Sequence, residues 1–562
     1  MMNHRLKAAV LIALVGATQV GRAEDATLGE VTAQDLLKLL VDEGVIDKTK
    51  LKALTEKIKE RKRTVAGAAV ESVGAEQRDA KPVADAQVVR VPYVPQYIKD
   101  EIRDQVRIGL KEDVSRDVLA QAKTERWGLP GALPEWINRI KFSGDMRLRE
   151  ESTFYASGNA QDDYFNIPYI NSKGGFAGNS PDLFLNTTED RNRLRARFRL
   201  GVNARVNDEF TAGARLVTGN QADPVSTNQT MGTYEQKWQN TFDLAYLKYS
   251  NLSKSFTFSG GRIENPFFST DLVWDNDLTF EGVAASWWML RSDSMDEEFR
   301  SFDPFITVGA FPLQEIDRSS HDKWLFSAQT GFQYDTADQS KFTLAAAYYG
   351  YKNIVGKMNA LDDTSLDYTA PQALQKGNTL FNIRNDLDPS AGNALFAHAA
   401  DYKLVDIFAE YDIANFAPVH VLVSADYVKN IGFDKKDVED RINGDSGTNI
   451  TVDARTKGYQ ARVAIGWPVI SKARDWQVSF MYRYLERDAV LAEFTDSDFH
   501  GGGTDAKGYV LKFDYGIADN TWLSLRWLSS NEIDGDNYPE YTGVGTGKLG
   551  IDTLQLDLNA KF

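Results

Sequence analysis

The sequence contains no cysteine, few histidines and no long apolar run beyond its first residues. The lack of cysteine excludes disulfides and thiolate metal ligands. No stretch after residue 23 approaches the roughly 18 apolar residues of a membrane-spanning helix, which excludes a helical membrane bundle. The five histidines form no HExxH motif; they are His4, His321, His398, His420 and His500. We therefore expect no metal site, no cofactor and no enzymatic activity.

An excess of basic residues is also missing. The chain has 80 acidic and 64 basic residues among 562, a formal net charge of -16. Nucleic-acid binding requires a basic face. This composition therefore predicts no nucleic-acid partner.

The first segment has the three parts of a secretory signal. Arg5 and Lys7 precede an apolar stretch, and small residues surround position 23. The apolar stretch is too short for a membrane anchor. Residues 1–23 are therefore predicted to be a signal peptide, and its removal makes the chain more acidic.

The next segments have helical rather than alternating periodicity. Residues 24–63 predict two short helices that pack on each other or on other copies of the chain. Residues 64–95 read as a linker. Residues 96–136 predict an amphipathic periplasmic helix followed by a Trp/Pro-rich junction. This helix packs on its own domain or serves as an oligomeric stalk or plug, so a coiled coil and a homotrimer are expectations.

From Ile140 to Phe562 the apolar residues recur at every second position. In the clearest segment, Leu194, Phe198 and Val202 share one face while arginines occupy the other. This period of two predicts strands. A soluble β-sandwich is the alternative, but a face that repeatedly carries Arg, Asp and Gln needs water on its side. Residues 137–562 thus predict a membrane all-β fold, an antiparallel transmembrane barrel of about 16 strands with a periplasmic helical region before it.

Several motifs resemble the putative porins of Gram-negative outer membranes and, more distantly, the general diffusion porins. They occupy Tyr93–Ile102, Trp127–Trp136, Gly144–Arg149, Gly261–Phe267, Leu272–Asp277 and the last strand. The resemblance covers nearly the whole mature chain and implies a porin-type barrel. It also implies that terminal Phe562 is part of the signal read by the barrel-assembly machinery.

The residues predicted to line the pore form a basic wall on three neighbouring strands. They are Arg147, Arg149, Arg193, Arg195, Arg197, Arg199, Arg205 and Arg215. Like charges this close need counter-charges or water. We expect the counter-charges to come from acids in and beside the third long loop, which in general porins folds into the barrel. These acids are Glu264, Asp271, Asp275, Asp277 and Glu281.

Together these observations predict an outer-membrane porin for passive diffusion of small hydrophilic solutes and ions. A transverse field between the arginines and the acids would orient the solutes, or the arginines merely solvate the lumen without selectivity. A substrate-selective channel for an anionic nutrient, a surface adhesin and an envelope tether are the alternatives. The expected partners are outer-membrane lipid and lipopolysaccharide, the assembly machinery and further copies of the chain.

Overall fold

The computed structural model describes residues 139–161, 164–175, 181–290, 301–317, 319–385, 394–444, 450–534 and 549–562. The predicted signal peptide, helices and linker lie outside these residues. No helix within the described ranges is long and apolar enough to cross a membrane.

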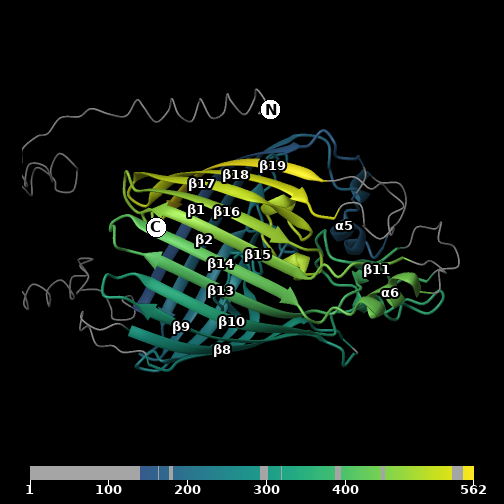
Figure 1. Cartoon of the computed structure of the whole chain (residues 1–562), viewed down its shortest axis with the longest axis horizontal. Coiled ribbons are helices and arrows are strands. Elements are labelled where there is room, and N and C mark those ends of the chain that lie inside the picture. Colours follow the sequence, from purple (N-terminus) through teal and green to yellow (C-terminus); the bar gives the residue numbers. More distant parts are fainter. Residues whose placement is uncertain are drawn as a thin grey trace, which may run out of the picture. The chain divides into compact units, whose positions relative to one another are not determined.

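Sixteen strands of the described residues close into an antiparallel barrel, as the alternation predicts (Figure 1). In chain order they are β1 (Ile140–Tyr155), β2 (Arg191–Arg205), β3 (Phe210–Thr218), β5 (Asn240–Ser250), β6 (Phe256–Ile263), β7 (Phe280–Trp288), β8 (Ser301–Gln314), β9 (Lys323–Asp335), β10 (Lys341–Lys352), β13 (Lys403–Ile413), β14 (His420–Asn430), β15 (Lys457–Gly466), β16 (Trp476–Leu485), β17 (Ala506–Ala518), β18 (Thr521–Glu532) and β19 (Gly550–Lys561). Each pairs with the next, and β19 pairs with β1. Closure leaves no unpaired strand edge.

The last residue takes part in this closure. The backbone N–H and C=O of Phe562 bond to Gly144 of β1 at 3.0 and 2.9 Å. A Cβ on Gly144 would lie 2.4 Å from the Phe562 ring, so a side chain at position 144 would displace the terminal aromatic.

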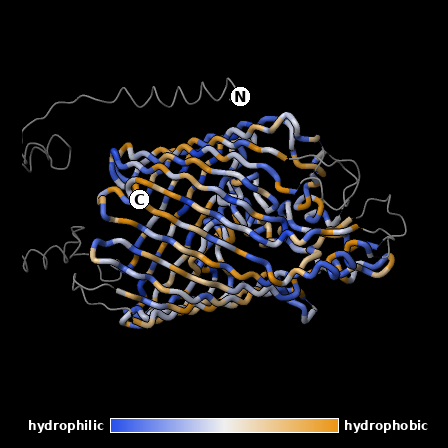
Figure 2. Tube along the Cα trace, in the orientation of Figure 1, coloured by the Kyte–Doolittle hydropathy of each residue, from blue (hydrophilic) through white to orange (hydrophobic). Residues whose placement is uncertain are grey.

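The two faces of the wall differ in the way a membrane barrel requires. On β13, Val405 and Ile407 are exposed on the outside, whereas Asp406 is 1% exposed on the inside. The same alternation of apolar and polar residues runs along the other strands (Figure 2). An apolar outer face and a polar interior match a bilayer outside and water inside.

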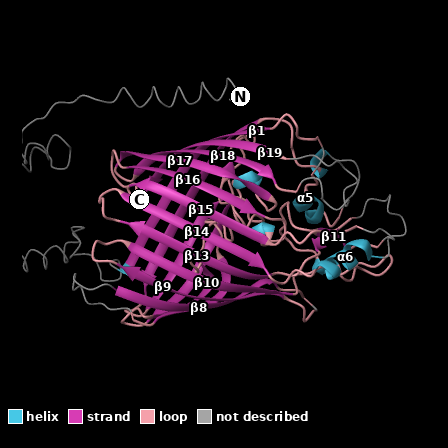
Figure 3. Cartoon of the chain, in the orientation of Figure 1, coloured by secondary structure: helices cyan, strands magenta, loops and turns pink. Residues whose placement is uncertain are grey.

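Short turns join the strands at one end of the barrel and long loops at the other. Most short elements lie in the long loops, gathered at that end (Figure 3). They are α5 (Ile167–Ser172), β4 (Gln229–Thr230), β11 (Leu380–Asn382), β12 (Phe396–His398), α6 (Lys435–Asn443) and single turns of 3₁₀ helix at Pro181–Leu183, Asp367–Thr369, Ala492–Phe494 and Phe499–Gly501. We name four loops by their residues: L2 (219–239), L3 (264–279), L5 (353–402) and L7 (486–505).

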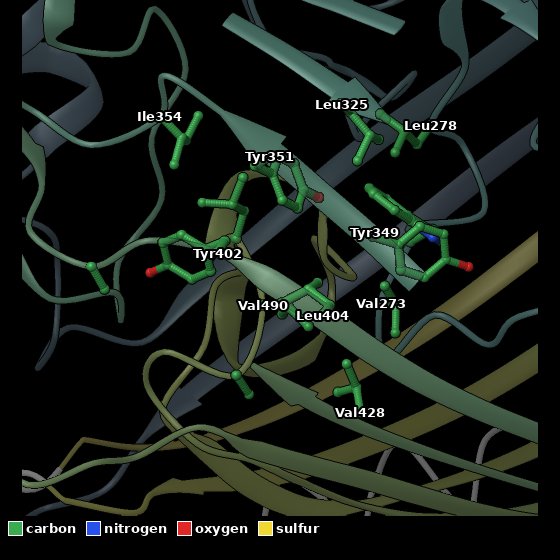
Figure 4. Packing of buried hydrophobic residues seen from close by; sticks show 14 of the residues in the cluster. Val273, Leu278, Leu325, Tyr349, Tyr351, Ile354, Tyr402, Leu404, Val428 and Val490 are labelled. Atoms are coloured by element: carbon green, nitrogen blue, oxygen red, sulfur yellow. The ribbon is translucent and has the colours of Figure 1, made fainter. Parts of the chain in front are cut away.

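An apolar cluster fills part of the barrel beneath these loops. Figure 4 shows Val273 of L3 beside Tyr349 of β10, Leu278 of L3 beside Leu325 of β9, and Val490 of L7 beside Leu404 of β13, all in one cluster. Tyr349 and Leu404 are fully buried. The packed cluster occupies the side of β6–β10, β13 and β14, which leaves the opposite wall, β1 and β2, to face the open lumen.

Candidate functional site

The basic side chains of β1 and β2 form one strip on the inner wall. The register places Arg147 opposite Arg197 and Arg149 opposite Arg195, with Asp145 opposite Arg199 at one end. Glu151 closes the other end opposite Arg193. We call Arg147, Arg149, Arg193, Arg195, Arg197 and Arg199 the basic strip. Cross-strand pairs of like charge destabilise a sheet, so this strip requires nearby carboxylates.

Two carboxylates of β1 itself supply much of that charge. Asp145 binds Arg197 at 3.0 Å and Arg199 at 2.7 Å. Glu151, which is 2% exposed, forms ion pairs with Arg193 and Arg195. Each acid thus bridges two successive arginines of the strip.

L3 folds into the barrel and crosses the lumen. The strands on either side of it, β6 and β7, bend at Gly261 and Gly282, which pair directly and have φ of 116° and 136°. A Cβ at either would lie 2.3 Å from a backbone oxygen of the neighbouring strand, so only glycine fits these bends. The loop is then fixed on the far wall, because the backbone N–H and hydroxyl of Thr270 both donate to Asp426 of β14.

One acid of L3 returns to the basic strip. Asp277 lies 3.4 Å from Arg197 and 3.2 Å from Arg199, and Thr227 of L2 donates a hydrogen bond to it. Burial raises the pKa of Asp277, but Arg197 and Arg199 outweigh this effect and hold the pKa below its usual value. The carboxylate is therefore charged at neutral pH and is in direct contact with the strip in the narrow part of the lumen.

L7 folds inward as well and meets the strip from another side. Asp498 forms ion pairs with Arg149 and Arg526 at 2.8 and 2.9 Å and lies 3.9 Å from Arg195. Burial raises the pKa of Asp498, yet the three cations hold it well below the usual range. The narrow part of the lumen is therefore enclosed by two loops.

A buried arginine joins these two loops. Arg483 of β16 binds Asp271 of L3 at 2.6 Å and Asp496 of L7 at 3.3 Å. Its Nε donates to Gln460 at 2.7 Å, and its guanidinium stacks on Phe499 at 4.8 Å. With an exposure of 1%, Arg483 fixes the relative positions of L3 and L7.

Cavities flank this enclosed layer. On the long-loop side a cavity of about 570 Å³ includes Arg193 and Arg195, with walls from the 156–190 loop, L2, L5 and L7. On the short-turn side a cavity of about 480 Å³ includes Arg147, Arg149 and Arg197. Arg195 and Arg197 are successive inward residues of β2, roughly 7 Å apart along the strand. The basic strip thus passes from one cavity to the other.

The cavity on the short-turn side has more cations than acids. Its walls hold six cations, Arg147, Arg149, Arg197, Arg462, Lys512 and Arg526, and three carboxylates, Asp271, Glu410 and Asp557. Within the described part of the chain, Arg147 and Arg462 have no carboxylate within ion-pair distance and bond to the amides of Asn228 and Gln477. These two arginines keep their charge uncompensated by direct contact.

Sequence comparison agrees with this architecture. The family model described as "Putative porin" matches residues 30–562. The chain belongs to this family. No curated protein matches the chain.

Solved outer-membrane proteins are similar at low identity. They include the channel DcaP of Acinetobacter baumannii (11% identity, 75% of this chain and 97% of that chain, TM-score 0.37) and OprB of Pseudomonas putida at high pH (12%, 78% and 97%, 0.41). OmpF of Salmonella typhi in complex with daunomycin is similar too (12%, 75% and 97%, 0.34). Family and fold point to an outer-membrane channel rather than an enzyme.

The acids predicted beside L3 of this porin lie in several different places. Of the five, Asp277 contacts the basic strip. Asp271 pairs instead with Arg483 of β16. Asp275 accepts backbone N–H groups of Asp277 and Ser497, and burial next to Asp496 and Asp277 raises its pKa well above the usual value. Glu281 pairs with Arg262.

The remaining predicted residues lie at the margins of the lumen. Arg215 pairs with Asp243 of β5 at 2.6 Å, and Glu264 has no ion pair within the described ranges. Arg205, the last residue of β2, is exposed at the short-turn rim. The basic wall therefore narrows to the six arginines of the basic strip.

Sequence reasoning missed the acids and cations that complete the porin's narrow layer. Asp145 and Glu151 were readable as inward residues of β1, but a long loop joins β1 to β2 and leaves their register undetermined. Asp498 reaches Arg149, and Asp496 reaches Arg483, only because L7 folds inward. No turn or periodicity signal in 486–505 indicates that path.

Proposed function

We propose that this chain is a channel through which small hydrophilic solutes diffuse passively across the outer membrane, with a preference for anions. The observation that carries this proposal is the basic strip. It runs continuously from the cavity on the long-loop side, the outer cavity, to the cavity on the short-turn side, the inner cavity. Carboxylates of L3 and L7 face it in the narrow layer between them. Such an arrangement produces a transverse field that orients a polar solute as it passes.

The anion preference comes from positive charge that the protein leaves uncompensated. Arg147 and Arg462 line the inner cavity, both are partly exposed, and no carboxylate of the described residues pairs with either of them. The other charges of the strip are largely neutralised, so we expect a moderate preference and not an exclusive one.

Single-channel recording of the refolded protein in a planar bilayer under a salt gradient tests both parts. We expect steady ohmic steps and a reversal potential of the sign that indicates anion preference. Arg147→Gln with Arg462→Gln should reduce this potential, whereas Arg205→Gln, at the exposed rim, should leave it unchanged. Silence from a folded barrel would refute the channel, and a cation-selective wild type would refute the anion preference.

A further inference from the structure

Lysines line one rim of the outer wall at the long-loop end. They are Lys352 of β10, Lys403 of β13, Lys429 of β14, Lys457 of β15 and Lys507 of β17, and all five are exposed. We call them the lysine rim. Each lies in the outward phase of its strand; Lys403, for example, precedes the exposed Val405 and Ile407. The lysine rim therefore faces the membrane side of the barrel and not the lumen.

Two of these lysines are direct cross-strand neighbours. Lys429 of β14 is opposite Lys457 of β15 in the register. Like charges in directly opposed positions destabilise a sheet. Neither lysine has a carboxylate within ion-pair distance in the described part of the chain, and the same holds for Lys507. This cost would be removed by an anion bound between them.

The other charges of this rim do not compensate the lysines fully. Asp401 pairs with Lys403 at 2.8 Å. Glu486, in the outward phase after β16, accepts the backbone N–H of Lys457 at 2.8 Å and the hydroxyl of Tyr484. It makes no ion pair with a rim lysine. Two carboxylates therefore face five lysines on this surface.

A belt of tyrosines shows where the lysine rim lies relative to a bilayer. Tyr427, Tyr459 and Tyr509 are outward residues two positions closer to the membrane than Lys429, Lys457 and Lys507. Tyr459 also stacks on Tyr484, with ring centroids 5.1 Å apart. Aromatic residues of this kind occupy the boundary between acyl chains and headgroups. The lysine ammonium groups then extend roughly 7 Å further along the strands, to the depth of the headgroup phosphates.

The lysine rim covers only one side of the barrel. The register places Asn531 of β18 opposite Lys507, and Gly550 of β19 opposite Asn531, so the row of lysines ends at β17. A surface that served only for general attraction to the membrane would not need this asymmetry. A one-sided basic rim fits a ligand that is seated at a particular place on the barrel.

We propose that the lysine rim is a binding site for the phosphate groups of the glycolipid in the outer leaflet, with Lys429, Lys457 and Lys507 as its principal contacts. The ligand must be anionic, must lie at headgroup depth and must reach a surface that borders lipid, and a phosphorylated lipid meets all three conditions. The assignment rests on the orientation implied by the proposed function, with the long loops outside. It adds a lipid site to the outer surface that the channel itself does not require.

The test compares retention of lipid A by the folded full-length barrel in detergent, measured by native mass spectrometry. The variant combines Lys429→Gln, Lys457→Gln and Lys507→Gln. The control removes the same charge at the short-turn end by Lys341→Gln, Lys472→Gln and Lys561→Gln. A lysine near an anionic lipid surface contributes about a fivefold gain in affinity, so we expect the rim variant to bind bisphosphorylated lipid A about a hundredfold more weakly.

The control should bind as the wild type does, and dephosphorylated lipid A should bind weakly to all three proteins. Equal retention of bisphosphorylated lipid A by the wild type and the rim variant would overturn the proposal. Complete displacement of the lipid by an excess of inorganic phosphate would overturn the assignment to a lipid. Because retention is measured independently of conductance, a silent channel would count against the proposed function and not against this site.

Discussion

Replacing Arg483 with methionine should detach L3 and L7 from each other and widen the passage between the two cavities. Arg483 is buried and is the cation that both Asp271 and Asp496 contact. Methionine is unbranched, apolar and somewhat shorter than arginine, so the change removes the charge and hydrogen bonds while it keeps part of the packing in this site.

The expected effect is large because two carboxylates lose their cation inside the protein. Removing one partner of a buried ion pair costs roughly 3–5 kcal/mol. Applied to the equilibrium between anchored and detached loops, this free energy corresponds to a factor of roughly 10² to 5 × 10³ in favour of the detached state. The wall strand itself keeps its backbone hydrogen bonds, so we expect the barrel to stay folded.

Single-channel recordings provide the assay. Arg483→Met should show a higher mean conductance and more open-channel noise than the wild type. Arg483→Met combined with Asp271→Asn and Asp496→Asn is the control, because neutral amides need no counter-charge and should restore quiet currents. Wild-type conductance and noise in Arg483→Met would refute the view that this arginine fixes the two loops.

Three further outcomes follow from single residues. Asp277→Asn should move the reversal potential toward greater anion preference, because Arg197 and Arg199 lose a carboxylate at 3.4 and 3.2 Å; an unchanged potential would show that the strip does not act on ions. Glu151→Gln should lower the free energy of unfolding in urea by roughly 3–5 kcal/mol because Arg193 and Arg195 lose their common partner, whereas the outward Glu150→Gln should change it by about 0.5 kcal/mol or less. Burial raises the pKa of Asp505, in L7 just before β17, to about 7. A raised carboxyl pKa gives stability that is complete below the unfolded value of about 4 and lost as the pH rises through the folded value. The free energy of unfolding should therefore fall between about pH 4 and about pH 7 in the wild type, and less so in Asp505→Asn; identical pH profiles would contradict this assignment.

The strands could be predicted from the sequence because each carries its own signal. Alternation along Leu194–Val202 depends only on which side of the wall meets lipid and which meets water, and it is readable without knowing any neighbour. All sixteen predicted strands therefore correspond to strands of the barrel. The number of strands in the barrel follows from the same local signal.

The narrow layer could not be predicted in the same way, because its contacts join residues far apart in the chain. Arg149 and Asp557 are 408 positions apart, and Arg149 and Asp498 are 349 apart. The basic strip was visible as a run of arginines on β2, but its counter-charges depend on the register between β1 and β2 and on the inward path of L7. Neither quantity leaves a periodic trace in the sequence.

The anion preference that we propose depends on where the charges of the chain lie and not on their total. The chain has a formal net charge of -16, yet the walls of the inner cavity hold six cations and three carboxylates. In the narrow layer, Asp145, Glu151, Asp277 and Asp498 pair with the strip, and the transverse field that we propose there would act on the orientation of a solute. The uncompensated charges of the inner cavity act instead on whether anions or cations enter it. Because Arg147 and Arg462 are partly exposed on the wall of this cavity, dissolved salt should screen them, with a Debye length that falls from about 10 Å at 0.1 M to about 3 Å at 1 M. Anion preference should therefore decline with ionic strength, whereas the limit on solute size, which L3 and L7 set by packing, should not.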